Sequence, residues 1–127
     1  MLCMAMNGRF DLGLRVLALL AAEPEAMHTS QAIAEELKES AVMVRRVFLQ
    51  LHEAGFIVQR KGPSGGAKLK VAAKEVGIGD VFAATAGEWL GVEDKALASL
   101  MKKTAAHAVA AMNETTLAQV VKRMKKG

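Results

Sequence analysis

The sequence predicts a mainly α-helical fold that carries one small β-hairpin, and two observations predict it. Apolar residues recur at helical spacing in several segments, and strict alternation of apolar and polar residues is found only in the stretch after Gly55. Apolar residues make up 52% of the 127 residues and are mostly Ala, Val, Leu and Met, whereas aromatic residues make up 4%. This composition favours helix over sheet.

Three helical segments are expected in the first half of the chain. The first covers residues 9–22, with Asn7 as its N-cap. Thr29 or Ser30 should cap a short second helix, and Ser40 should cap a third helix that Gly55 ends. The apolar positions of the third helix follow the i, i+3, i+4, i+7 rule and should face the core: Val44, Val47, Phe48 and Leu51. Its outward positions are then Arg45, Arg46 and Gln50.

The stretches FIVQRK and KLKV alternate, and the glycine-rich segment GPSGGA separates them. Two short strands joined by a long tip are therefore predicted. A short helix over residues 78–89, a break at Gly87–Gly91, a long helix over about residues 93–112 and a last short helix follow. We expect residues 1–88 to form one domain, and residues 89–127 to form a long helix with a short C-terminal helix.

The tight turn Lys38–Glu39 separates the second and third helices, so the predicted order is that of a helix-turn-helix followed by a hairpin wing. The glycine-rich tip must also be compared with a phosphate-binding loop, which needs G-x-x-x-x-G-K-[ST] at the start of a helix. Counting from Gly62, Ala67 replaces the second glycine and Leu69 replaces the hydroxyl residue. A tip that contacts nucleic acid fits better, and a plain connecting loop is the alternative.

Charge is unevenly distributed along the chain, whose formal net charge is +4. Five acids and one lysine lie between Glu23 and Glu39, whereas six bases and one acid lie between Arg45 and Lys70. A basic segment of this kind is typical of proteins that bind polyanions. An ordinary solvated face is the alternative interpretation.

The long helix carries one stripe of apolar and small residues: Leu97, Leu100, Met101, Thr104, Ala108 and Met112. A chain of this size can hardly bury such a helix alone, so a two-fold contact between two copies of the helix is expected. Packing of the stripe on its own domain is the alternative.

Six stretches of the chain form a recognisable set: GRFDLGLRVLALLA, TSQAIAEEL, VRRVFLQLHEAGFI, KGPSGGAKL, GIGDVFAAT and MNETTLAQVV. They resemble the bacterial Rrf-type winged-helix regulators, the family of the iron–sulfur cluster regulator, the nitric-oxide-sensing repressor and the cysteine-metabolism repressor. The resemblance covers nearly the whole chain and implies a homodimer that binds pseudo-palindromic promoter DNA. We expect this regulator to be a repressor. The residues expected at DNA are Arg9, Thr29, Ser30, Val42, Met43, Arg45, Arg46, Arg60, Lys61, Ser64, Gly65, Gly66 and Lys68.

Many members of that family hold an iron–sulfur cluster with three cysteines between the wing and the long helix. This chain has one cysteine, Cys3, so it resembles the cluster-free branch, and no cofactor or metal is expected. Cys3 is either a redox-sensing thiol or a small hydrophobic residue near the terminus.

Two other functions remain open. A winged helix can use its wing to contact another protein, and a small nucleotide-binding protein could use the glycine loop at residues 62–68. The sequence has no Ser/His/Asp, Cys/His or paired-carboxylate arrangement, so no enzymatic activity is expected. Nor does any apolar run approach the ~20 residues that span a bilayer, which predicts a cytoplasmic protein without a membrane partner. The effector remains unknown.

Overall fold

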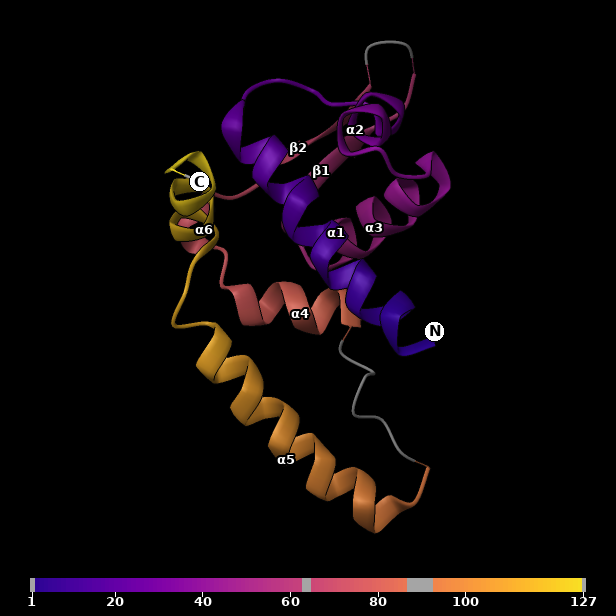
Figure 1. Ribbon diagram of the computed structural model, residues 1–127, viewed down its shortest axis with the longest axis vertical. Coiled ribbons are helices and arrows are strands. Elements are labelled where there is room, and N and C mark those ends of the chain that lie inside the picture. Colours follow the sequence, from indigo (N-terminus) through magenta and orange to yellow (C-terminus); the bar gives the residue numbers. More distant parts are fainter. Residues whose placement is uncertain (1, 63–64, 87–92, 127) are drawn as a thin grey trace.

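The chain folds around its first helix, which runs through the middle of the body in Figure 1. The structure is a computed structural model, and it describes residues 2–62, 65–86 and 93–126. In chain order, the elements of the first half are α1 (Leu2–Ala22), α2 (Ser30–Leu37), α3 (Ala41–Glu53), β1 (Ile57–Arg60) and β2 (Gly66–Leu69). A 3₁₀ turn, η1 (Ala73–Glu75), follows, and then come α4 (Ile78–Ala86), α5 (Lys95–Met112) and α6 (Leu117–Lys126). The predicted fold class, mainly helical with one antiparallel hairpin, is confirmed.

The core is built around α1, against which α2, α3, α4 and α6 pack. From α1 come Leu12, Val16, Leu17 and Leu20, all at most 3% exposed. As the spacing predicted, α3 contributes Val44, Val47, Phe48 and Leu51, all at most 2% exposed. Burial of each such side chain stabilises the fold by about 1.5–3 kcal/mol. The opposite side of α3 is therefore the side that remains free for other contacts.

The start of α1 differs from the prediction, because the helix begins at Leu2 and Asn7 lies inside it. The expectation that Asn7 caps the helix is therefore wrong. The residues before Asn7 are mostly good helix formers and include no proline or glycine, so nothing stops the helix from extending towards the terminus.

The second strand of the hairpin also begins two residues earlier than predicted, because it has a second partner. On one edge β2 pairs with β1 in the register Ile57↔Leu69 to Arg60↔Gly66. On the other edge, the Ala67 amide donates to the His28 carbonyl at 2.8 Å, and the His28 amide donates to the Ala67 carbonyl at 2.9 Å. The loop between α1 and α2 thus fixes the hairpin, which we call the wing (residues 57–69), to the body.

Gly66 makes this close approach possible. Its φ is +131°, and a Cβ built there would lie 2.5 Å from the His28 carbonyl oxygen. Gly62 also has a positive φ, +101°, but a Cβ there would meet nothing within 4 Å. Both glycines therefore have a positive φ, but only Gly62 has room for a side chain.

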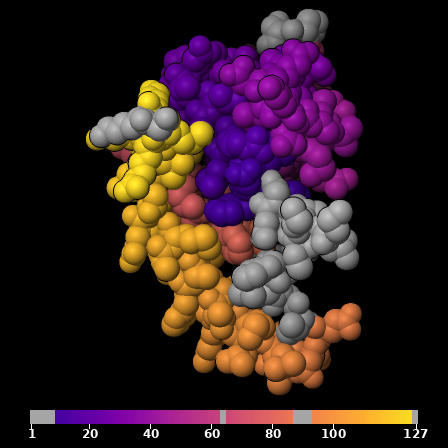
Figure 2. All heavy atoms as spheres, in the orientation of Figure 1, coloured from indigo at the N-terminus to yellow at the C-terminus, as the bar shows by residue number. Residues whose placement is uncertain are grey.

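The last two helices, α5 and α6, differ in how much they contact the rest of the molecule. In Figure 1 α5 runs away from the rest of the chain, and in Figure 2 its orange atoms form a projection below the body. In contrast, α6 packs on α1, and its first residue, Leu117, is 0% exposed. The predicted break at Gly87–Gly91, which includes Trp89, lies outside the described residues.

None of the described helices combines the length and apolar character that crossing a bilayer requires.

We predict that Gly66→Ala destabilises the protein more than Gly62→Ala does. Both substitutions place alanine at a positive φ, which costs more than about 0.4–1 kcal/mol of unfolding free energy. Only the Gly66 variant adds a clash with the His28 carbonyl and so weakens the attachment of the wing. Denaturant unfolding of the two variants measures the difference. Equal losses would contradict the role given to the His28 contact.

Candidate nucleic-acid interface

Hydrogen bonds define the start of α2, the turn after it and the start of α3. At the start of α2, the Ala32 amide donates to the Thr29 hydroxyl at 3.0 Å. At its end Lys38 adopts the left-handed conformation, with φ +58°, and the Glu39 amide donates to the Ala34 carbonyl. The Met43 amide then donates to the Ser40 hydroxyl at 3.4 Å and caps α3. The caps predicted at Thr29 and Ser40 are confirmed, and each satisfies an amide in the first turn of its own helix.

An ion pair connects this turn to the central helix. The Arg15 guanidinium donates to Glu39 at 2.9 Å and to Asp11 at 3.0 Å. The hydrogen bond to Glu39, with further contributions from Asp11, raises the pKa of Arg15 above its ordinary value although partial burial opposes the rise. Arg15 is 31% exposed, so solvent screens the pairs and their contribution to the free energy of unfolding is small.

Two arginines and two apolar side chains are exposed on α3. Arg45 and Arg46 are exposed, as predicted, and so are Val42 and Leu49, at 58% and 52%. Leu49 lies four residues after Arg45 and three after Arg46, so it shares their face. The sequence reasoning missed Leu49, although this spacing could have indicated it.

Two neighbouring residues of α3 are less accessible than expected. Met43 is half-buried and packs against the core. Gln50, predicted to point outward, is also half-buried, and its side-chain oxygen is buried without a hydrogen-bond partner among the residues that the structure describes. The exposed face of α3 is therefore narrower than the sequence indicated.

The wing adds cations beside this helix. Arg60 and Lys61 are exposed, whereas Lys68 is half-buried. In the antiparallel register Arg60 stands opposite Gly66, and Lys68 stands opposite Val58. Residues two apart on a strand share a face, so Arg60 and Lys68 project on the same side of the hairpin.

The tip of the wing closes on itself. The Gly65 amide donates to the Gly62 carbonyl at 2.9 Å, and Gly65 is buried, with the Arg60 carbonyl where its Cβ would be. Its amide is therefore not free for a phosphate oxygen. Moreover, β2 begins at Gly66, so the loop leads into a strand and not into the helix N-terminus of a phosphate-binding loop. Ser64 lies outside the described residues.

The other expected contact residues lie at several places. Thr29 is exposed, and its hydroxyl is occupied by the cap of α2, while Ser30 is half-buried in the first turn. Arg9 is half-buried on α1, next to Phe10, whose ring packs edge-on against Phe82 of α4 with centroids 5.4 Å apart. Arg9 is therefore at the level of α4 and not beside the wing. Cys3 lies in the first turn of α1.

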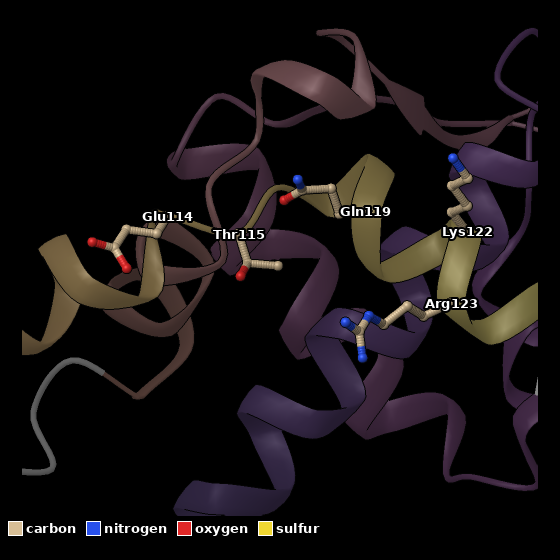
Figure 3. A pocket seen from close by; sticks show the side chains of 5 residues that line it. All are labelled: Glu114, Thr115, Gln119, Lys122 and Arg123. Atoms are coloured by element: carbon tan, nitrogen blue, oxygen red, sulfur yellow. The ribbon is translucent and has the colours of Figure 1, made fainter.

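A polar hollow of about 570 Å³ lies elsewhere, beside α6 (Figure 3). Gln119, Lys122 and Arg123 come from α6, and Glu114 and Thr115 come from the turn before it. All five residues are exposed, so the hollow is an open surface depression without buried groups that could fix a ligand. The surface formed by α3 and the wing therefore remains the candidate functional site.

A capped helix-turn-helix followed by a basic hairpin defines a winged-helix protein of the DNA-binding class. Residues 6–123 match the Rrf2 family, which is described as an iron-dependent transcriptional regulator. The chain therefore belongs to the Rrf2 family of winged-helix transcriptional regulators, as the sequence resemblance indicated. A search of functionally curated protein sequences found no significant match.

Solved structures of regulators share the fold over nearly their whole length. CymR of B. subtilis, the global cysteine regulator, is 21% identical, with a TM-score of 0.70 over 91% of this chain and 94% of its own. CymR of Staphylococcus aureus is 26% identical, with a TM-score of 0.67 over 90% and 95%. IscR of T. potens is 21% identical, with a TM-score of 0.69 over 91% and 85%.

The residues of this chain do not fit an iron–sulfur cluster of the family's three-cysteine kind. The sequence has one cysteine, and none lies between the wing and α5. Among the residues that the structure describes, His, Cys, Asp and Glu form no group of three or more that could hold a metal ion. An iron–sulfur cluster is normally held by cysteine thiolates, and one chain supplies too few of them.

Proposed function

We propose that the protein is a homodimeric repressor that binds pseudo-palindromic promoter sites without an iron–sulfur cluster. Each subunit would insert α3 into the major groove and lay its wing along the DNA backbone or minor groove. The observation that carries the proposal is the exposed cationic face of α3, where Arg45 and Arg46 project from a helix whose opposite side is fully used by the core.

The wing supports this proposal. Arg60 and Lys61 are exposed, and Arg60 shares a face with Lys68, so their positive charge can contact phosphates. Val42 and Leu49 offer apolar contacts of the kind that thymine methyl groups accept. The glycines Gly65 and Gly66 would act indirectly, because they shape and fix the tip and carry no side chain that could reach DNA.

The rival functions predict different binding behaviour. If the wing contacts DNA phosphates, the affinity for duplex DNA should fall steeply as salt concentration rises. If the wing contacts another protein instead, no such strong salt dependence of duplex binding is expected. A nucleotide-binding role for residues 62–68 is disfavoured because the Gly65 amide is already paired and a strand follows. Competition between duplex DNA and nucleotides distinguishes these cases.

We predict that Arg45→Ala and Arg46→Ala each weaken binding to the protein's own promoter. An arginine that reads guanine should lose about 1–3 kcal/mol of discrimination at one base pair. An arginine that contacts phosphate should weaken all sequences alike and lower the salt slope by about one. Lys74→Ala, which removes an exposed charge from η1, is the matched control and should bind as the parent does. A folded double variant with parental affinity would refute the assignment of α3.

Dimer formation rests on α5. No described residue of α5 is buried, and Leu97 and Leu100 are 53% and 55% exposed. Met101 is half-buried, and the Thr104 hydroxyl donates to the Leu100 carbonyl at 3.3 Å. Ala108 and Met112 are also half-buried, near the end of α5 that packs on α4. A second copy of α5 would cover the projecting part of this stripe, which one chain leaves in water.

We predict that Leu100→Glu converts the protein into a monomer. A charge placed there would be buried twice in a two-fold interface without a partner, at a cost of several kcal/mol. Ala106→Glu places the same charge on the opposite, exposed face of α5 and should leave the dimer intact. Sedimentation at micromolar concentration measures both variants and the parent. A monomeric parent, or a dimeric Leu100 variant with normal operator affinity, would place the interface elsewhere.

We also predict that the purified protein binds DNA without iron and stays colourless after anaerobic incubation with iron and sulfide. One cysteine per chain cannot supply the thiolates of a stable cluster. Visible absorbance and iron analysis after desalting provide the measurement. A stoichiometric chromophore would overturn the cluster-free proposal and would mean that residues other than three cysteines of one chain hold the cluster.

A further inference from the structure

Two short stretches outside the DNA-binding face meet at the base of α5. The stretch GIGD, residues 77–80, opens α4, and the stretch MNETT, residues 112–116, closes α5. Gly77 and Thr116 form an antiparallel bridge. The Leu117 amide donates to the Val76 carbonyl at 2.7 Å, and the Ile78 amide donates to the Thr115 carbonyl at 3.0 Å.

Asn113 completes this junction with two side-chain hydrogen bonds. Its Oδ1 accepts from the Asp80 amide at 3.0 Å, and its Nδ2 donates to Asp80 Oδ1 at 3.0 Å. The Asp80 amide lies in the first turn of α4 and also donates to the Gly77 carbonyl at 3.1 Å, so Asn113 shares this donor with the backbone. Asn113 is also the C-cap residue of α5, so one side chain connects the end of one helix to the start of the other.

Two glycines allow the helices to come this close. A Cβ at Gly79 would lie 2.1 Å from the Val109 carbonyl oxygen of α5, and a Cβ at Gly77 would lie 2.1 Å from Asn113 Oδ1. Neither glycine has a positive φ, so the requirement is for space. We call the set Gly77, Gly79, Asp80, Val109 and Asn113 the α4–α5 clamp.

The clamp fixes the direction in which α5 leaves the body, because α5 packs chiefly on α4. From Asn113 to Leu97 the helix rises about 24 Å, at about 1.5 Å per residue. A change of about 10° at the clamp would therefore move the far end of α5 by about 4 Å. A small change of angle at the clamp thus produces a large displacement of the part of α5 on which a second subunit would pack.

We propose that the α4–α5 clamp is a specificity-determining element that sets the spacing of the two half-sites the dimer can bind. The inference rests on the proposed function, in which α5 joins two winged-helix bodies. Half-site spacing follows from the geometry of the dimer. The clamp determines how each α3 is placed relative to the two-fold axis, although none of its residues contacts DNA.

A charge-swap series at residues 80 and 113 tests the clamp. Asn113→Asp puts a carboxylate against the Asp80 carboxylate and removes the donor between them. Asp80→Asn keeps an oxygen that can accept from Asn113, so it is the matched control. The double variant Asp80→Asn/Asn113→Asp restores a donor and an acceptor in exchanged positions and should rescue the geometry.

The readout is affinity for a panel of duplexes with two half-sites and varied spacers, and affinity for one isolated half-site. The parent should prefer one spacer. Asn113→Asp should remain a folded dimer with unchanged half-site affinity, but should lose about 10²-fold on the preferred spacer because both half-sites no longer engage together. The double variant should recover the preference. Should Asn113→Asp fail to fold, Asn113→Ala removes both hydrogen bonds without adding charge and is expected to give the same loss.

The outcomes separate this inference from the proposed function. A parent that binds no duplex site would overturn the proposed function and the inference with it. A parent with one preferred spacer and an Asn113→Asp variant that keeps this preference would overturn the inference alone. A variant that dissociates into monomers would also overturn it, because the clamp would then support association and not geometry. Failure of the double variant to recover would show that the Asp80–Asn113 pair does not set the spacing.

Discussion

Burial of α1 is the constraint on which the other elements depend. Val16, Leu17 and Leu20 are 0% exposed because helices from both halves of the chain cover them. Each covering helix must then present its apolar side inward, which leaves its polar side outside. For α3 this means that the arginines project into solvent as a consequence of core packing, and not by a separate arrangement.

The same central helix holds the parts that must keep a fixed relation to one another. Arg15 of α1 is paired with Glu39 in the turn, and α3 itself packs on α1. The loop that follows α1 holds the wing through the His28–Ala67 pair. Helix and wing thus share one reference element, which is what a rigid two-part contact with a DNA duplex needs.

Local signals in the sequence were sufficient for much of this arrangement. The caps at Thr29 and Ser40, the glycine after α3 and the inward positions of α3 all follow from residues within one or two turns of each other. The start of β2 did not, because it depends on His28, almost forty residues earlier. The tip glycines were interpreted as open to DNA, yet Gly65 and Gly66 face backbone atoms of their own chain. Met43 is expected at DNA but is half-buried against the core, because the local period does not reveal how far neighbouring elements cover a helix.

The position of Leu117 has a consequence for how the chain acquires its structure during synthesis. The winged-helix core contains this residue from α6, whose contacts with α1 join segments separated by about the length of the chain. During synthesis α1, α2, α3 and the wing emerge first, but the apolar surface of α1 stays partly uncovered until α6 leaves the ribosome. Because α5 precedes α6 in the chain, it leaves the ribosome before α6 does. The helix that would pair two subunits, α5, therefore emerges before α6 completes the core of the winged-helix body that would recognise DNA.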